Sequence, residues 1–163
     1  MSPYLYYFSF IHSLLRYIVI ILTLIVVVQS IVGMQSKGTF KDGNRKMALF
    51  MMISCDLQLL AGLAVYYLGG HLLLIQKGMA MSDHYNRFYA MEHPLSMIIG
   101  IVSVHLAYKT AKKTMDDAKK LKKIFWFAFI ALFLFVSQTP WPSKKDTSKP
   151  WLPGMATAAV AHA

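Results

Sequence analysis

Acidic residues and cysteine are both scarce in this chain. Only 7 of its 163 residues are aspartate or glutamate, against 17 lysines and arginines. Charged residues make up 15% of the chain, whereas a soluble domain carries roughly a quarter. The single cysteine, Cys55, excludes an internal disulfide and is interpreted as a small packing residue. The low content of charged residues argues against an ordinary soluble domain, and the single cysteine argues against a domain stabilised by disulfide bonds.

Several motifs of catalysis and cofactor binding are missing as well. The chain has no Ser/His/Asp arrangement and no glycine-rich phosphate loop. It also has no Cys-x-x-Cys-His motif, which excludes covalent haem attachment but leaves a non-covalent b-type haem open. Asp83 and His84 would supply only two ligands, which are too few for a metal site. His71, His84 and His162 are assigned no function.

What the chain has instead is long apolar stretches, with 56% hydrophobic residues and a mean hydropathy of +0.47. A membrane-spanning helix needs about 20 apolar residues. The pattern predicts an all-α, integral membrane four-helix bundle with up-and-down topology, because short connections favour antiparallel neighbours. The first stretch lacks a basic start and a cleavage site, so we expect it to be a retained helix. The predicted helices span residues of about 4–33, 47–69, 90–112 and 123–141.

Basic residues are distributed unevenly between the two sides of this predicted bundle. The first and third connections, 34–46 and 109–123, carry 11 lysines and arginines, whereas the opposite side carries five. The positive-inside rule places the richer side in the cytoplasm and both termini outside. Topology and anionic lipid headgroups therefore explain the net charge of +10 without nucleic acid as a partner.

The connections and the tail give further expectations. Residues 109–123 contain no glycine or proline, so we expect them to prolong the third helix into the cytoplasm. Pro94 is expected in the first turn of that helix, where its missing N–H does little harm. The tail, 143–163, is expected to be extended and mobile unless a partner holds it.

Polar side chains inside the apolar stretches are the candidate functional residues, because such groups are costly in hydrocarbon. His12 and His93 are predicted at similar depth on the side of the termini. Arg16 is four residues after His12 and therefore on the same helix face. Two facing imidazoles can hold one b-type haem, and Arg16 can neutralise a propionate or pair with Glu92. The alternative is that both histidines only form hydrogen bonds in a polar seam between helices.

Further polar residues belong to the second and third predicted helices. His105 is about 120° around the helix from His93, so the two do not share one stripe, and His105 is a weaker candidate for a second cofactor. Asp56, Gln58 and Glu92 form a candidate polar or proton network. Asp56 is either protonated or paired with Arg16, and the sequence leaves this choice open.

Four segments resemble a family of small four-helix membrane proteins of Bacteroidota-type bacteria, often labelled "cytochrome B". The segments are IHSLLRY at 11–17, DLQLLAGL at 56–63 with Tyr66, RFYAMEH at 87–93, and PWP at 140–142. Together they cover roughly residues 5–142 and leave the tail outside. The chain departs from the family at Asp56, where some members have a histidine.

The resemblance implies a haem-binding electron carrier in a bacterial inner membrane. We therefore expect a b-type cytochrome-like protein that passes electrons between quinol and a partner, as a subunit or accessory of a larger membrane complex. One haem near one face cannot carry an electron across the bilayer alone, which implies a quinone site or partner subunits. Two alternatives stay open: a haem-free structural or assembly subunit, and a proton- or ion-coupled component using Asp56, Arg16 and Glu92.

Overall fold

The computed structural model describes residues 2–36 and 38–152. In these two ranges every regular element is helical. The elements in chain order are α1 (Pro3–Gln35), α2 (Asp42–Leu68), α3 (His71–Gln76), α4 (His84–Arg87), the π-helical turn η1 (Phe88–Glu92), α5 (His93–Ala111) and α6 (Asp117–Gln138).

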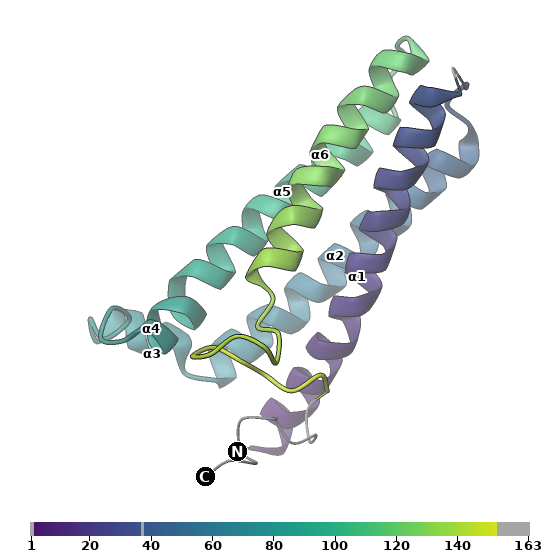
Figure 1. Ribbon diagram of the computed structural model, residues 1–163. Coiled ribbons are helices and arrows are strands. Elements are labelled where there is room, and N and C mark those ends of the chain that lie inside the picture. The colour runs from purple at the N-terminus through teal and green to yellow at the C-terminus, as the bar shows by residue number, and fades with distance from the viewer. Residues whose placement is uncertain (1, 37, 153–163) are drawn as a thin grey trace.

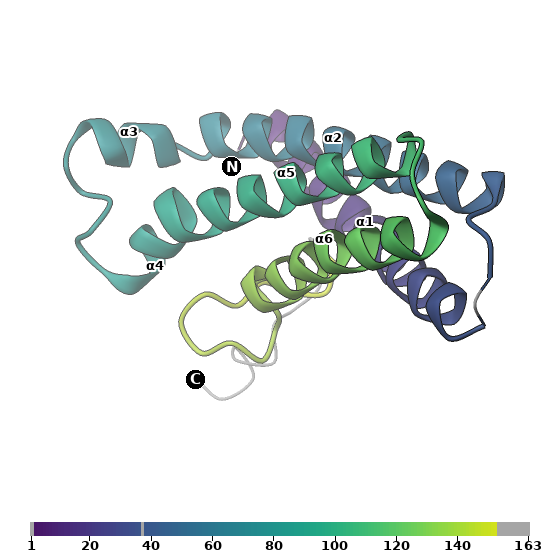
Figure 2. The same cartoon turned by 90° about the horizontal axis from the view of Figure 1, so that it is seen from above.

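The long helices form an up-and-down bundle, which confirms the predicted fold class. α1 packs against α2 and α6, and α5 packs against the same two helices, so α1 and α5 lie diagonally opposite (Figures 1 and 2). The start of α1, the end of α6 and the segment from α3 to α4 lie together, and we call this the terminal end. The end of α1, the start of α2 and the connection 112–116 form the opposite, basic end.

Four helical segments are long and apolar enough to cross a membrane, which indicates a multi-pass membrane protein. They are Pro3–Gln35, Asp42–Leu68, His84–Ala111 and Asp117–Gln138. Large apolar side chains stand exposed on the outside of the bundle, among them Leu60 on α2, Leu95 on α5 and Phe133 on α6. Buried hydroxyls are satisfied within their own helices, as where Thr23 donates to the carbonyl of Val19 at 2.7 Å. Both features suit the hydrocarbon core of a membrane, which offers no hydrogen bonds to the protein.

Small residues bring the helices close together. Ala48, Ala107, Ala128 and Ala131 are completely or almost completely buried, and small side chains allow the backbones of neighbouring helices to approach. At Gly100 of α5, an added Cβ would come within 2.5 Å of the Phe135 ring of α6. The bundle core is therefore built from close backbone contacts filled by a few larger side chains.

The prediction that residues 109–123 prolong the third helix is wrong. α5 ends at Ala111, and the Asp116 side chain accepts a hydrogen bond from the backbone N–H of Lys119 at 3.0 Å. Such an N-cap starts a new helix without glycine or proline. α6 consequently begins six residues earlier than the predicted start at 123 and ends at Gln138 rather than at 141.

Pro94 is in the first turn of α5, as predicted, but α5 continues a helical segment that already starts at His84, before the predicted start at about residue 90. A proline has no N–H for the carbonyl four residues before it, and its ring crowds that carbonyl. The backbone widens here into the π turn η1, in which the His93 N–H donates to the Phe88 carbonyl. The hydroxyl of Tyr66 on α2 donates to the carbonyl of Ala90 at 2.8 Å. Another helix thus supplies the hydrogen bond that Pro94 cannot make.

Residues 143–152 of the tail do not extend away from the bundle, in contrast to the expectation of an extended tail. It folds back across the terminal end towards α1 (Figure 1). The Tyr89 hydroxyl donates to the carbonyl of Thr147 at 2.7 Å, and Trp151 packs on Trp141 with ring centroids 5.8 Å apart. The chain therefore holds this part of the tail itself. Residues 153–163, including His162, lie outside the described ranges.

Candidate functional site

His12 and His93 meet in the interior of the bundle at the terminal end. They come from the diagonally opposite helices α1 and α5, and their ring centroids are 6.4 Å apart with the planes at 75°. Two imidazoles on opposite sides of one metal ion would have centroids about 6 Å apart, since each metal–nitrogen bond is about 2 Å. The predicted convergence of the two histidines at one depth is present in the structure, in a spacing that suits axial ligands.

Hydrogen bonds orient one of these imidazoles and leave the other poorly satisfied. Nδ1 of His93 lies 2.9 Å from the carbonyl oxygen of Gln138, so it donates and leaves Nε2 with its lone pair. In His12, Nδ1 is buried without a hydrogen-bond partner. Its Nε2 lies 3.5 Å from Nε2 of Gln58, whose Oε1 is also buried and unpaired. Unsatisfied buried polar groups are rare and call for a physical reason.

Gly62 of α2 makes room for the His12 ring. A Cβ at this position would lie 3.0 Å from Cε1 and 3.4 Å from Nδ1 of His12. The close contact exists because glycine carries no side chain. No local pattern singles out Gly62 for this role, because the contact joins residues 50 positions apart.

Arg16 is buried and lies one turn along α1 from His12. Its Nη2 donates to the hydroxyl of Tyr17 at 3.0 Å and to the carbonyl of Trp151 at 2.8 Å. The guanidinium also lies over the rings of Tyr17 and Trp141, and its buried Nε has no partner. The tail thus covers a buried cation beside the two histidines, a contact that the sequence did not predict.

The predicted polar network of Asp56, Gln58 and Glu92 is divided among separate places. Glu92 pairs with Arg87, with Nε and Oε1 at 2.7 Å, instead of with Arg16. Gln58 faces His12. Asp56 pairs with neither of these. The proposed proton-coupled group of Asp56, Arg16 and Glu92 therefore does not form one cluster in this structure.

Asp56 instead pairs with His105 across the seam between α2 and α5. Nε2 of His105 lies 3.3 Å from Oδ1 of Asp56, and each side chain is 45% exposed. Nδ1 of His105 lies 2.9 Å from the carbonyl of Ile101, one turn back on α5. Both nitrogens of His105 thus face oxygen acceptors. Its angular separation from His93 is as predicted, since the two histidines contact different helices.

An aromatic cluster extends from the histidine pair to the α3 segment, and the sequence did not indicate it. His71 stacks on Tyr89 with centroids 5.7 Å apart and lies 5.8 Å from Tyr66. Tyr89 in turn lies 6.5 Å from His93. Burial, and secondarily the positive charge of Lys149, lowers the pKa of His71 below its ordinary value. His71 is therefore a half-buried member of the stack rather than a solvated loop histidine.

The donor set at His12 and His93 fits haem better than a bare metal ion. In the two described ranges, no group of three or more histidine, cysteine, aspartate or glutamate side chains is placed to hold a metal. A haem needs only axial ligands from the protein. His93 already has the arrangement typical of a metal-bound histidine, in which the other ring nitrogen donates to a backbone carbonyl. His12 lacks this second-nitrogen acceptor, because its Nδ1 is buried without a partner.

The comparisons with known proteins do not identify a ligand for the His12–His93 site. Comparison of the chain with protein-family models, with curated proteins and with solved structures found no match.

Proposed function

We propose that the protein is a b-type cytochrome-like membrane protein in which His12 and His93 hold one haem. The observation that carries this proposal is the meeting of two imidazoles from diagonal helices, with centroids 6.4 Å apart. Hydrogen bonding of His93 to the Gln138 carbonyl supports it, because this bond leaves Nε2 free to act as a ligand. When bound, haem supplies one-electron oxidation and reduction.

The surrounding residues would tune this site by position and charge. Gln138 fixes the tautomer of His93, and Gly62 leaves space for the ring of His12. Arg16 is a buried positive charge one turn from His12, and it can neutralise a haem propionate. For that contact, the Arg16 guanidinium would have to exchange the Trp151 carbonyl for a carboxylate.

The same proposal includes the setting of the protein. We place it in a bacterial inner membrane with the basic end in the cytoplasm and both termini in the periplasm, because positively charged connections are retained inside. The histidine pair then lies towards the periplasmic side. An electron carrier needs both an electron donor and an electron acceptor. We take these to be quinol and another subunit of a larger complex.

One specific observation favours a second candidate, a haem-free structural or assembly subunit. His12 and His93 already contact each other edge to face, and His93 joins α5 to the end of α6 through Gln138. These interactions lock three helices together without a metal. A flat macrocycle could enter only if the two rings and their neighbours moved to admit it.

An absorption spectrum of the purified full-length protein distinguishes the two candidates. From haem-replete cells, we expect a Soret band and a reduced-minus-oxidised α-band, and we expect His12→Ala and His93→Ala to lose both. His105→Ala is the matched control and should keep them. A colourless wild-type preparation, with normal folding by circular dichroism, would favour the structural subunit. Colour that survives both substitutions would overturn the ligand assignment.

A further inference from the structure

The first ten residues of the tail, 143–152, cross the terminal end, and we call them the strap (Figure 1). The hydroxyl of Tyr89 donates to the carbonyl of Thr147 at 2.7 Å. Nη2 of Arg16 donates to the carbonyl of Trp151 at 2.8 Å. Both acceptors are uncharged backbone oxygens, and a hydrogen bond of this kind adds little net stability because water replaces it when it breaks. The strap is therefore held by contacts that a stronger acceptor can replace.

Arg16 is a buried cation without a counter-charge. It is 8% exposed, yet none of the ion pairs among the residues that the structure describes includes it. Its hydrogen bonds reach only the Tyr17 hydroxyl and the Trp151 carbonyl, and its buried Nε has no partner. Buried charges are usually paired with an opposite charge, because their desolvation is costly. The natural partner of this guanidinium is therefore an anion.

The edge of the guanidinium that holds the strap matches a carboxylate. Nε and Nη2 lie on the same edge of this planar group, so a carboxylate can accept one hydrogen bond from each. The Trp151 carbonyl uses Nη2 alone. The guanidinium also lies 5.6 Å from the ring centroid of Trp141, and tryptophan is favoured at the membrane interface. A carboxylate at this level belongs to a fatty acid of the membrane or to a haem propionate.

Movement of the strap would widen a space beside the histidine pair. A hollow of about 340 Å³ is lined by residues 144–147 of the strap, and by Phe88 and Gln138 among others. Both of these residues contact His93. The rings of Phe88 and His93 have centroids 5.8 Å apart, and the Gln138 carbonyl oxygen lies 2.9 Å from Nδ1 of His93. Opening of the strap should therefore make His93 more accessible.

We propose that Arg16 binds a carboxylate and that the strap competes for the same guanidinium, so that carboxylate binding releases the strap. The Trp151 carbonyl accepts from both Arg16 and Tyr17. A carboxylate in its place therefore breaks both bonds that tie this carbonyl to α1. The proposal rests on the proposed function only where the carboxylate is a haem propionate. The Arg16 site and the strap themselves do not require haem.

The test uses haem-free, full-length protein in nanodiscs that contain phosphatidylglycerol, so that phosphate groups are present in every sample. Hydrogen exchange of the strap reports its opening, because the Lys149 N–H donates to the Pro140 carbonyl in the closed state. Oleate should accelerate this exchange by about tenfold, because a charged acceptor binds the guanidinium more strongly than a neutral one. Methyl oleate has the same chain without the charge and should have no effect.

Two variants test the attachments of the strap. Arg16→Gln should exchange faster than wild type without a ligand and should not respond to oleate. Arg45→Gln is the matched control, because Arg45 is exposed at the basic end, and it should respond like wild type. Tyr89→Phe removes the bond to Thr147, so it should exchange about two- to tenfold faster and keep its response to oleate. Circular dichroism checks folding, and Tyr89→Phe keeps the test decisive if Arg16→Gln does not fold.

Haem and its dimethyl ester separate the two sources of carboxylate. If the propionate binds Arg16, haem should accelerate exchange of the strap and the dimethyl ester should not. A response to oleate alone assigns the site to a fatty acid. A sample without a Soret band shows failure of haem binding and leaves the oleate result standing. If neither acid accelerates exchange, or if each ester acts like its acid, the proposal is overturned.

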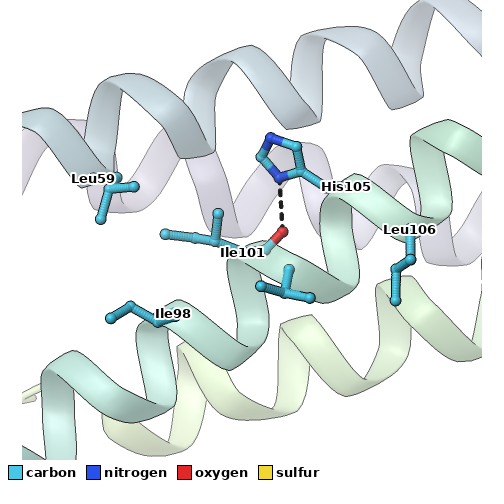
Figure 3. Close-up of a pocket in the computed structure, with 6 residues that line it drawn as sticks. Leu59, Ile98, Ile101, His105 and Leu106 are labelled. Carbon is cyan, nitrogen blue, oxygen red and sulfur yellow. Dashed lines mark hydrogen bonds between the residues drawn. The ribbon is translucent and has the colours of Figure 1, made fainter.

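Diethyl pyrocarbonate, which modifies unprotonated imidazoles, measures access to His93 in the haem-free samples. Oleate should speed the modification of His93, whose Nε2 keeps its lone pair. His105 is the internal control, because it lies near the other end of α5, with Nδ1 2.9 Å from the carbonyl of Ile101 (Figure 3). It should react at the same rate in all samples. Unchanged modification of His93 while the strap exchanges faster would contradict release of the strap over the histidine pair.

Discussion

Two histidines on the same helix have opposite surroundings. His93 begins α5 and faces the interior, where it meets His12 and the carbonyl of Gln138. His105, twelve residues later, faces the seam with α2, where it pairs with Asp56 and stays half exposed. Twelve residues rotate a helix by about 120° beyond whole turns and advance it by about 18 Å. α5 therefore contributes to two sites that point in different directions and are too far apart to share a ligand.

The two sites differ in how far the rest of the chain encloses them. The His12–His93 site is enclosed by helices, by the aromatic cluster around Tyr89 and by the folded-back tail. The Asp56–His105 pair lies at the seam between α2 and α5, and both side chains are half exposed. The predictions below test this distinction.

The largest effect is expected from filling the closed site at Gly62. Gly62→Leu places a side chain where a Cβ alone would lie 3.0 Å from His12. Overpacking of this kind costs about 1–3 kcal/mol, and displacement of the His12 ring should also abolish haem absorbance. Thermal unfolding in detergent and the haem-to-protein ratio measure the two effects.

The matched control is Gly43→Leu on the same helix. A Cβ at Gly43 meets nothing within 4 Å, so only the higher helix propensity of leucine remains, a gain of about 0.8 kcal/mol. Equal melting temperatures for the two variants would show that the space beside His12 is not restricted, and the description of this site as closed would be wrong.

The next effect concerns the hydrogen bond that supports the widened turn before His93. Tyr66→Phe removes the donor to the Ala90 carbonyl, which Pro94 cannot replace. Leaving a buried carbonyl unpaired costs about 1–3 kcal/mol. Tyr67→Phe is the control, because Tyr67 is 71% exposed and its loss should change stability by less than about 0.5 kcal/mol. Chemical denaturation of both variants compares them; a Tyr66→Phe protein as stable as wild type would contradict this role of Tyr66.

A smaller effect is expected when the open site is altered. A double-mutant cycle with Asp56→Asn and His105→Gln should give a coupling of about 1 kcal/mol or less in detergent, because both side chains are half exposed. The same cycle in a thick lipid bilayer should give a larger coupling, since water no longer screens the pair. Equal coupling in both media would indicate that the pair is closed off from lipid, against the comparison drawn above.

The fold and the meeting of His12 and His93 could be predicted because they follow from periodicity and length. Apolar runs fix the four helices, and helical angle separates His93 from His105. The partners of Arg16 and Asp56 could not be predicted, because they depend on contacts between distant segments. Arg16 finds the Trp151 carbonyl only because the tail folds back over α1, and no local pattern in residues 143–152 signals that.

The π turn shows the same limit at short range. Pro94 is in the first turn of α5, as predicted, but the residues before it are helical too. The helical segment starts at His84, where the Asp83 side chain accepts a hydrogen bond from the Asn86 N–H at 2.9 Å. An aspartate N-cap is a local feature, whereas the hydrogen bond from Tyr66 is tertiary and has no local signal. That bond allows the helix to pass through the proline.

The smallest effect is a pH dependence at the outer edge of the closed site. Burial lowers the pKa of His71 below its ordinary 6.5, so the unfolded chain binds a proton more readily than the folded one. Stability from this group is therefore complete above about pH 6.5 and is lost as the pH falls through that value towards the lower folded pKa.

Hydrogen exchange of α3 over this range should become faster as the pH falls, after correction for the intrinsic exchange rate. His71→Phe keeps a ring between Tyr66 and Tyr89 but cannot titrate, so its α3 should lack this acceleration. If wild type and His71→Phe respond identically to pH, protonation of His71 does not loosen the aromatic cluster, and the terminal end is closed by its packing and by the tail alone.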